Sequence, residues 1–396
     1  MGLHNILLVL SAFALTADAL AQQTVADSIV HNGLVRHFQL RLPTTASDTQ
    51  NRPLVLNLHG GSGNMVSAQG FTQMNPVADA NGFAIAWPQG YGIAPPGFSW
   101  ADGRNTSADQ AGVDDVGFLN ALVDSLVEDY GFDDQRIYIC GFSNGGFMVQ
   151  RMACESPSKF AAMASLGCSM DVDLFAACSP DLVRPFLMMN GTSDPAMPYE
   201  GGPMENPLVT PVVPVIEAVQ FWRETLLCQS ESSADLPNSS LTDNSTVERF
   251  QYTNCHCGAE MWFYRIENGG HTWPGVYLPQ LEATLGVTNL DISASSELWA
   301  FFEPFSLCNI PLSANEPIVR EREVYTVYPN PVDGVLMVTG DMNDLLRVTL
   351  RSLDGKVVRD IQRPRFPLDL GSLNRGVYIV EFHTANGRVS QRILKQ

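Results

Sequence analysis

Lysine is almost absent from the first 321 residues, where Lys159 is the only one. Of the formal net charge of −19, residues 322–396 carry +3, from 11 Lys and Arg against 8 Asp and Glu, and the remaining residues carry −22, from 12 against 34. Nucleic acids and anionic membranes require clustered basic side chains, so neither is expected as a partner. The change in charge near residue 322 also indicates a domain boundary.

Long hydrophobic runs are missing as well, apart from one near the first residue. Residues 6–15 are apolar and are followed by Ala19-Leu20-Ala21, a pattern typical of a signal peptide, although no Lys or Arg precedes the run. A buried first helix is the alternative, but capping residues and a polar face are lacking. We therefore predict a signal peptide over residues 1–21 and an exported mature protein without a membrane span.

Metal-binding clusters are scarce too. Cys255-His256-Cys257 supplies too few ligands for a zinc site, and no second cluster completes it, so no metal is expected. The chain has eight cysteines, and in an exported protein at least some of them are expected to form disulfides. The expected states are buried thiols at Cys140 and Cys154, a Cys168–Cys178 bridge, and a bridge from Cys228 to either Cys255 or Cys257.

The most informative feature that is present is the sequence G-F-S-N-G over residues 141–145. An apolar, strand-like run ends at Cys140, and a helix-forming segment follows from Phe147 to Cys154. A serine on such a strand-to-helix turn is a nucleophile elbow, whose glycines are required because a Cβ would collide with the neighbouring strand or helix. Ser143 is therefore the candidate nucleophile, although a serine between glycines is by itself often a simple turn.

Two further candidates follow strand-like runs, in the chain order of α/β-hydrolases: serine, acid, histidine. Asp194 ends the segment 185–194, and His271 lies in a glycine-rich loop after the run Met261–Ile266. In open α/β sheets, sites form at the carboxyl edge of the strands. Taken singly, Asp194 fits a loop cap and His271 a packed loop residue, but their order and placement together favour catalysis.

A glycine-rich loop also follows an earlier strand-like run, Leu54–Leu58. Its sequence H-G-G-S-G resembles the oxyanion loop of esterases, in which backbone N–H groups approach a substrate oxygen. The expected donors are the amides of Gly61, Ser62 and Asn144. His59 is expected to shape this loop rather than to act as a base.

Strand-like and helical patterns alternate along residues 27–308. Such alternation predicts an α/β fold with a doubly wound, mostly parallel sheet. Residues 229–248 are polar and are expected to form a solvated loop, and Asp114 and Asp115 are expected to cap a helix. The expected strands are 34–42, 54–58, 83–87, 137–140, 161–166, 186–189 and 261–266, and the expected helices are 113–130, 147–154, 215–227 and 293–302.

Five motifs recur in order: L-H-G-G-S-G-N, D-D-V-G-F-L, G-F-S-N-G-G, N-G-T-S-D-P-x-x-P-Y and G-G-H-T-W-P-G. With these motifs, residues 27–305 resemble the secreted esterases grouped with polyhydroxybutyrate depolymerases and with the feruloyl esterases of carbohydrate esterase family one. The resemblance implies an α/β-hydrolase fold and no cofactor. It also implies Ser143, Asp194 and His271 as the catalytic triad, with the loop after His59 as the oxyanion hole.

The C-terminal residues carry a second set of motifs. The sequences V-Y-P-N-P from Val327, L-D-G-K-V from Leu353, L-N-R-G-V-Y from Leu373 and R-I-L-K from Arg392 resemble the sorting domain of the type nine secretion system of Bacteroidota. Strand-like runs separated by Asp-Gly and Asn-Gly turns predict a small all-β sandwich. A carbohydrate-binding module is the alternative, but the few aromatic residues fit a core better than a sugar platform.

The predicted organisation follows from these boundaries. We expect a signal peptide at 1–21, an α/β-hydrolase esterase domain at 27–308, a linker at 309–323 and a sorting domain at 324–396. The sorting domain implies the secretion machinery as a partner and a secreted or cell-surface location.

The substrate is expected to be a feruloyl or acetyl ester of a plant polysaccharide. Only 50 residues separate Ser143 from Asp194, too few for a large lid, so an open cleft for bulky or polymeric esters is predicted. Trp100, Trp273 and Tyr199 are the expected substrate-binding residues. Two polar insertions, at about 229–246 and 277–291, are longer than expected for the family. They are the places where the rim of the site should differ from that of the family. The alternatives are a polyester depolymerase with the same triad and an inactive surface glycan-binding protein.

Overall fold

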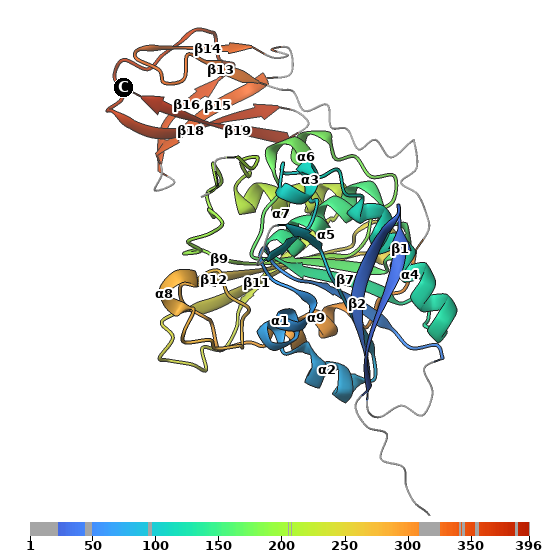
Figure 1. Cartoon of the computed structure of the whole chain (residues 1–396). Helices are drawn as coiled ribbons and strands as arrows, with labels where there is room; N and C mark the ends of the chain where they lie inside the picture. Colours follow the sequence, from blue (N-terminus) through green and yellow to red (C-terminus); the bar gives the residue numbers. More distant parts are fainter. Residues whose placement is uncertain are drawn as a thin grey trace, which may run out of the picture. The chain divides into compact units, whose positions relative to one another are not determined.

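The computed structural model describes residues 23–43, 50–93, 97–204, 206, 208–308, 325–339, 342, 345–352, 356–384 and 387–395. The predicted signal peptide at 1–21 and the predicted linker at 309–323 lie outside these residues. The chain divides into two compact units, Met1–Leu312 and Ser313–Gln396 (Figure 1). Each unit has hydrophobic core residues of its own.

A ten-stranded sheet runs through the first unit. In sheet order its strands are β1 (Gln23–His31), β2 (Leu34–Leu42), β4 (Ala84–Pro88), β3 (Leu54–Leu58), β7 (Ile137–Phe142), β8 (Ala162–Leu166), β9 (Phe186–Gly191), β12 (Met261–Glu267), β11 (Thr246–Thr253) and β10 (Ser230–Asp235). The strands from β4 to β12 pair in parallel, and the two at each edge pair antiparallel.

Helices cover both faces of this sheet (Figure 1). One face packs against α1 (Met65–Thr72), α2 (Met74–Asn81) and α9 (Ala294–Phe302), and the other against α4 (Asp115–Tyr130), α5 (Asn144–Glu155) and α7 (Val215–Thr225). The central strands are therefore buried on both sides, which explains why they read as continuous apolar runs. The mostly parallel sheet with helices on both faces confirms the predicted fold class.

Shorter elements complete the first unit. They are β5 (Tyr91–Ile93), β6 (Gly97–Ser99), α3 (Ser107–Gln110), α6 (Val172–Ala177), α8 (Glu282–Leu285) and the 3-10 turns Pro157–Lys159 and His256–Gly258. Among the helices that the structure describes, none is long and apolar enough to cross a membrane.

The polar segment from residue 229 to residue 248 differs from its prediction as a loop. It contains the edge strand β10 and the first residues of β11. Five of the six side chains of β10 are exposed, so the strand lacks the alternation of buried and exposed residues on which a sequence-based strand prediction depends. The backbone pairing with β11 forms the strand in spite of its polar sequence.

Three disulfides are present in the first unit. The predicted bridge from Cys228 is confirmed, and so is the buried thiol of Cys140. The predictions for Cys154 and Cys168 are wrong, because Cys154 is the residue that pairs with Cys178. Cys168 lies beneath α5, where a Cβ added to Gly146 would be 2.7 Å from its sulfur. The bridges are Cys154–Cys178, Cys228–Cys255 and Cys257–Cys308, and Cys168 is a second buried free thiol.

The second unit consists of two antiparallel sheets around a common core. One sheet has the order β13 (Thr326–Tyr328), β14 (Val335–Thr339), β17 (Leu368–Asp369), and the other has the order β16 (Val357–Gln362), β15 (Leu345–Ser352), β18 (Gly376–Thr384), β19 (Gly387–Lys395). The rings of Tyr325 and Phe382 are fully buried and stack with centroids 4.7 Å apart. These two aromatic residues therefore belong to the core, as expected from the sequence.

Candidate active site

Ser143 lies on the sharp turn between β7 and α5. Its backbone has φ 54° and ψ −121°, a strained conformation for a residue with a side chain, and its N–H donates to Leu166 O at 2.8 Å. A Cβ added to Gly141 would come within 2.3 Å of Gly145 O, and one added to Gly145 within 2.5 Å of Leu58 O. The turn therefore requires both glycines, as a nucleophile elbow does.

Asp194 and His271 meet at the carboxyl edge of the sheet. His271 Nδ1 and Asp194 Oδ2 are 2.6 Å apart, and both side chains are buried. The other carboxylate oxygen, Asp194 Oδ1, accepts hydrogen bonds from the N–H groups of Ala196 at 2.8 Å and Met197 at 2.7 Å. The carboxylate is thus fixed by backbone donors and in turn fixes the ring of His271. Because Nδ1 faces the carboxylate, Nε2 is the ring nitrogen that remains for proton exchange.

The ring of His271 lies beside the elbow. Its centroid is 4.7 Å from that of Phe142, the residue that precedes Ser143, and a Cβ added to Gly167 would be 3.3 Å from His271 Cε1. The backbone N–H of His271 donates to Leu285 O at 2.5 Å. Leu285 is the last residue of α8, so the insertion at 277–291 supplies a backbone hydrogen bond to the loop that contains His271. The structure brings the predicted histidine and acid together, and it places the histidine ring against the residue that precedes the predicted serine.

His59 holds the glycine-rich loop after β3. Its Nδ1 lies 2.8 Å from Gly60 O, and its Nε2 accepts a hydrogen bond from the Gly90 N–H at 3.0 Å. The side chain is buried, and burial lowers the pKa of His59 from 6.5 to about 4. At neutral pH the ring is therefore uncharged and ties two loops together, as its expected role in shaping the loop requires.

The expected oxyanion donors differ in their hydrogen bonds. The Ser62 N–H donates to Phe98 O at 3.0 Å, so this donor is occupied, and the prediction for Ser62 is corrected. Asn144 is the first residue of α5, where a backbone N–H has no acceptor within the helix. A Cβ added to Gly61 would be 3.6 Å from the Cβ of Asn144, so these two residues are neighbours.

The expected aromatic contacts to the substrate are also changed by the structure. Trp100 and Trp273 are 0% and 1% exposed, so neither presents a ring face on which a substrate could stack, and both predictions are corrected. Their indole N–H groups donate to His59 O at 3.0 Å and to Ser295 Oγ at 3.1 Å, which assigns them to packing. Tyr199 is half-buried, and its hydroxyl has no hydrogen-bond partner among the residues that the structure describes.

The structure has two buried ion pairs that the sequence did not predict. Asp114 caps α4 through the Gly117 N–H at 2.8 Å, as expected, but Asp115 instead pairs with Arg36 at 2.5 Å and accepts from the Ala101 N–H at 2.7 Å. Burial raises the pKa of Asp115, and Arg36 opposes this effect. The helical period of the sequence could have indicated that Asp115 is buried, because Asp115 lies on the same buried face of α4 as Phe118, Leu119 and Leu122.

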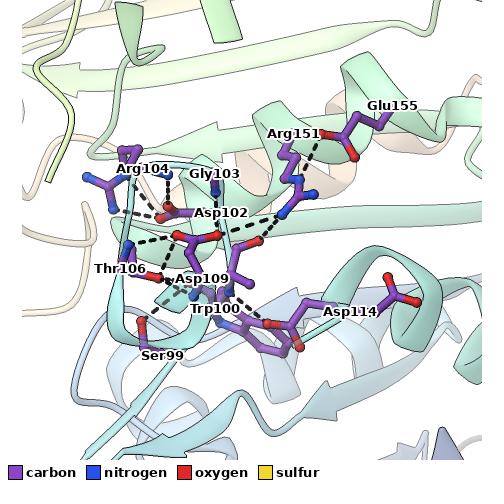
Figure 2. Close-up of polar contacts among 12 residues, drawn as sticks. Ser99, Trp100, Asp102, Gly103, Arg104, Thr106, Asp109, Asp114, Arg151 and Glu155 are labelled. Atoms are coloured by element: carbon purple, nitrogen blue, oxygen red, sulfur yellow. Dashed lines mark hydrogen bonds and ion pairs between the residues drawn. The ribbon is translucent and has the colours of Figure 1, made fainter. Parts of the chain in front are cut away.

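The second missed pair, Asp102 with Arg104, lies in the loop that connects β6 to α3. Both side chains are buried, and Arg104 Nη2 donates to Asp102 Oδ2 at 2.7 Å (Figure 2). No periodic pattern marks these positions, because the loop has no regular structure. Among the described residues, no group of three or more His, Cys, Asp or Glu side chains is placed to hold a metal ion.

Comparison with known families divides the chain as the structure does. Residues 36–195 match the family model for esterase PHB depolymerase, and residues 326–396 match the secretion system C-terminal sorting domain. A putative esterase, NocK of Nocardia uniformis subsp. tsuyamanensis, is 27% identical over 286 residues, which cover 69% of this chain and 80% of that protein.

Two further relatives are longer proteins. A bifunctional acetylxylan esterase/xylanase of Neocallimastix patriciarum is 23% identical over 252 residues, which cover 63% of this chain and 33% of that protein. Feruloyl esterase B of Piromyces equi is 24% identical over 240 residues, which cover 60% of this chain and 42% of that protein. The matches thus span less than half of each of these two relatives.

Proposed function

Because residues 36–195 match the family model for esterase PHB depolymerase and the chain is a carboxylic ester hydrolase, we propose that Ser143, His271 and Asp194 form its catalytic triad. The observation that carries the proposal is the 2.6 Å contact between His271 and Asp194 beside the elbow that bears Ser143. Ser143 is half-buried while the residues before and after it are buried, so its side chain is the one that solvent and substrate reach on this turn.

The proposed reaction proceeds through an acyl-enzyme. Ser143 Oγ attacks the carbonyl carbon of the ester while His271 Nε2 takes the hydroxyl proton. The tetrahedral intermediate then expels the alcohol, which receives this proton from His271. A water molecule attacks the acyl-enzyme in the same way and releases the carboxylic acid and free Ser143. Asp194 holds the tautomer and orientation of His271 throughout.

The negative oxygen of the tetrahedral intermediate is stabilised by backbone donors. We assign this role to the N–H groups of Asn144 and Gly61, since the Ser62 N–H is occupied by Phe98 O. An N–H at the first turn of a helix also has the positive end of the helix dipole behind it.

The proposed substrates are feruloyl or acetyl esters of plant polysaccharides. The relatives named as feruloyl and acetylxylan esterases support this class, as does the short span between Ser143 and Asp194. The acidic charge of the esterase unit favours neutral over anionic polymers. A polyester substrate is the second candidate, because the family model that matches residues 36–195 is that of PHB depolymerases.

A substrate panel tests this proposal. Purified protein is assayed with methyl ferulate, acetylated xylan, p-nitrophenyl esters of short and long acyl chains, and polyhydroxybutyrate film. We expect short acyl and hydroxycinnamoyl esters to exceed long-chain esters at least about tenfold in kcat/KM, a difference of roughly 1.4 kcal/mol. Clearing of the film without action on methyl ferulate would favour the polyester depolymerase, and no hydrolysis of any ester would favour the inactive glycan-binding protein.

The second unit is a secretion system C-terminal sorting domain, and we propose that it directs export by the type nine system. The esterase then acts in the secreted or cell-surface compartment, where its three disulfides are stable.

A further inference from the structure

The side chain of Asn144 is fully occupied by the loop that precedes α3. Its Oδ1 accepts from the Trp100 N–H at 2.8 Å and from Ser99 Oγ at 3.3 Å. Its Nδ2 donates to Asp102 Oδ2 at 2.6 Å and to Trp100 O at 3.2 Å. These contacts use both lone pairs and both hydrogens of the side-chain amide. The residue that follows the nucleophile is therefore held at four points, and its side chain is only 5% exposed.

The strongest of these contacts ends on a buried charge. Asp102 is 1% exposed, and a carboxylate so deeply buried requires a cationic partner. Arg104 supplies it through Nη2 at 2.7 Å and Nε at 3.1 Å, both donated to Asp102 Oδ2 (Figure 2). The bond from Asn144 to this oxygen is thus charge-assisted and stronger than a bond between neutral groups.

The ion pair is also attached to the same helix as Asn144. The guanidinium of Arg104 lies over the ring of Phe147, 3.4 Å from its centroid, and Phe147 is one helical turn after Asn144 in α5. The loop and the first turn of α5 are therefore linked twice, by the amide of Asn144 and by the stacked guanidinium. This arrangement limits the movement of the backbone at Asn144.

We propose that Asp102, with Arg104 as its counterion, is a positioning residue that orients Asn144 and thereby its backbone N–H in the oxyanion hole. The inference rests on the proposed function, since the N–H of Asn144 acts only if Ser143 is the nucleophile. Asp102 does not touch the substrate. It acts on the transition state, because a displaced donor loses more binding to the oxyanion than to the neutral carbonyl of the ground state.

Alanine at position 144 keeps the backbone N–H and removes its positioning contacts. We expect Asn144→Ala and Asp102→Ala each to lower kcat on p-nitrophenyl acetate by about 10- to 100-fold, with KM changed less than about threefold. Both should weaken inhibition by phenylboronic acid, which forms a tetrahedral adduct with a catalytic serine, by a similar factor. Because Asp102 acts on the oxyanion hole through Asn144, the double variant should lose little more than Asn144→Ala alone.

Arg151→Ala is the matched control. Arg151 also links α5 to this loop, through Ala101 O at 2.7 Å, but it lies two turns further along the helix than Asn144. Its Nε donates to Glu155 Oε1 at 2.8 Å (Figure 2). Its removal should leave kcat within about twofold and add to the effect of Asn144→Ala without coupling. A purely structural network would instead lower the melting temperature and kcat in all three variants alike.

Several outcomes would overturn the inference while leaving the triad intact. They are wild-type kcat and phenylboronic acid affinity in Asn144→Ala, or additive losses in the double variant. Asp102→Asn, which keeps the shape of the side chain, provides a second variant if Asp102→Ala does not fold. Loss of folding in both Asp102→Asn and Asn144→Ala would assign the network to stability alone. Failure of wild-type protein to react with a fluorophosphonate would instead reject the proposed function itself.

Discussion

The two carboxylate oxygens of Asp194 have different partners, and together they fix the orientation of His271. Its Oδ1 accepts from backbone donors, and its Oδ2 faces His271. We predict that His271→Ala lowers kcat at least about a thousandfold with the fold intact, and that Asp194→Asn has a similar or smaller effect. Steady-state kinetics on p-nitrophenyl acetate measures both. Asp173→Asn is the control, because this exposed residue lies in the first turn of α6. A large loss in that variant alone would reject Asp194 as the acid.

His59 makes the stability of the protein depend on pH. The pKa of its ring is lowered by burial from 6.5 to about 4. Between these values the unfolded chain binds more protons than the folded chain, so the free energy of unfolding is highest above pH 6.5 and decreases as the pH falls toward 4. We predict that the melting temperature of the wild type falls more steeply between about pH 7 and about pH 5 than that of His59→Gln. Parallel curves for the two proteins would contradict this role of His59.

The sequence pointed to the proposed triad through local patterns and missed the contacts that join segments far apart in the chain. Ser143, Asp194 and His271 each follow a strand, so motif and position indicated the site. The occupied N–H of Ser62 depends on Phe98, which belongs to another loop, and no local pattern reveals that bond. Likewise, the burial of Trp100 depends on the packing of its loop against α5.

At the scale of elements, the elbow depends on close contact between β3, β7 and α5. A Cβ on Gly145 would lie 2.5 Å from Leu58 O and 2.6 Å from His59 O, both of them backbone atoms. We predict that Gly145→Ala destabilises the protein by about 2 kcal/mol or more and also lowers kcat, because the strand and helix must move apart. Thermal unfolding and kinetics measure the two effects.

Gly70→Ala provides the matched control. Gly70 lies within α1, where an added Cβ would meet nothing within 4 Å. Alanine is the better helix former by up to about 1 kcal/mol, so this variant should be as stable as the wild type or slightly more stable. Equal melting temperatures for the two glycine variants would show that crowding at the elbow is not the cause.

Elements with a hydrophobic signal were predictable, and elements without one were not. The runs that became β3, β7, β8 and β9 are buried on both faces, so continuous apolar residues indicated them. β10 exposes five of its six side chains, and its place in the sheet comes from backbone pairing with β11, which no hydrophobic pattern indicates. The disulfide partner of Cys154 was equally hidden, because it depends on how α5 and α6 are placed in space.

At the scale of the whole molecule, the two units have separate cores and different charge. The esterase unit holds all the residues of the proposed triad and oxyanion hole, and the second unit holds its own antiparallel sheets. We predict that a protein ending at Ile310 keeps kcat/KM within about twofold of the full chain, because each unit folds around its own core. Loss of activity in the purified, folded truncation would show that the sorting domain contributes to the site. In the native host, the same truncation should block export.

The proposed triad makes this chain a serine esterase with Ser143 as its nucleophile. Peptide mass spectrometry after incubation with a fluorophosphonate tests it most directly, because this reagent phosphonylates an activated serine. We predict a single adduct on the wild-type protein, located at Ser143, and no adduct on Ser143→Ala. An adduct on another residue, or an equally labelled Ser143→Ala variant, would show that Ser143 is not the nucleophile.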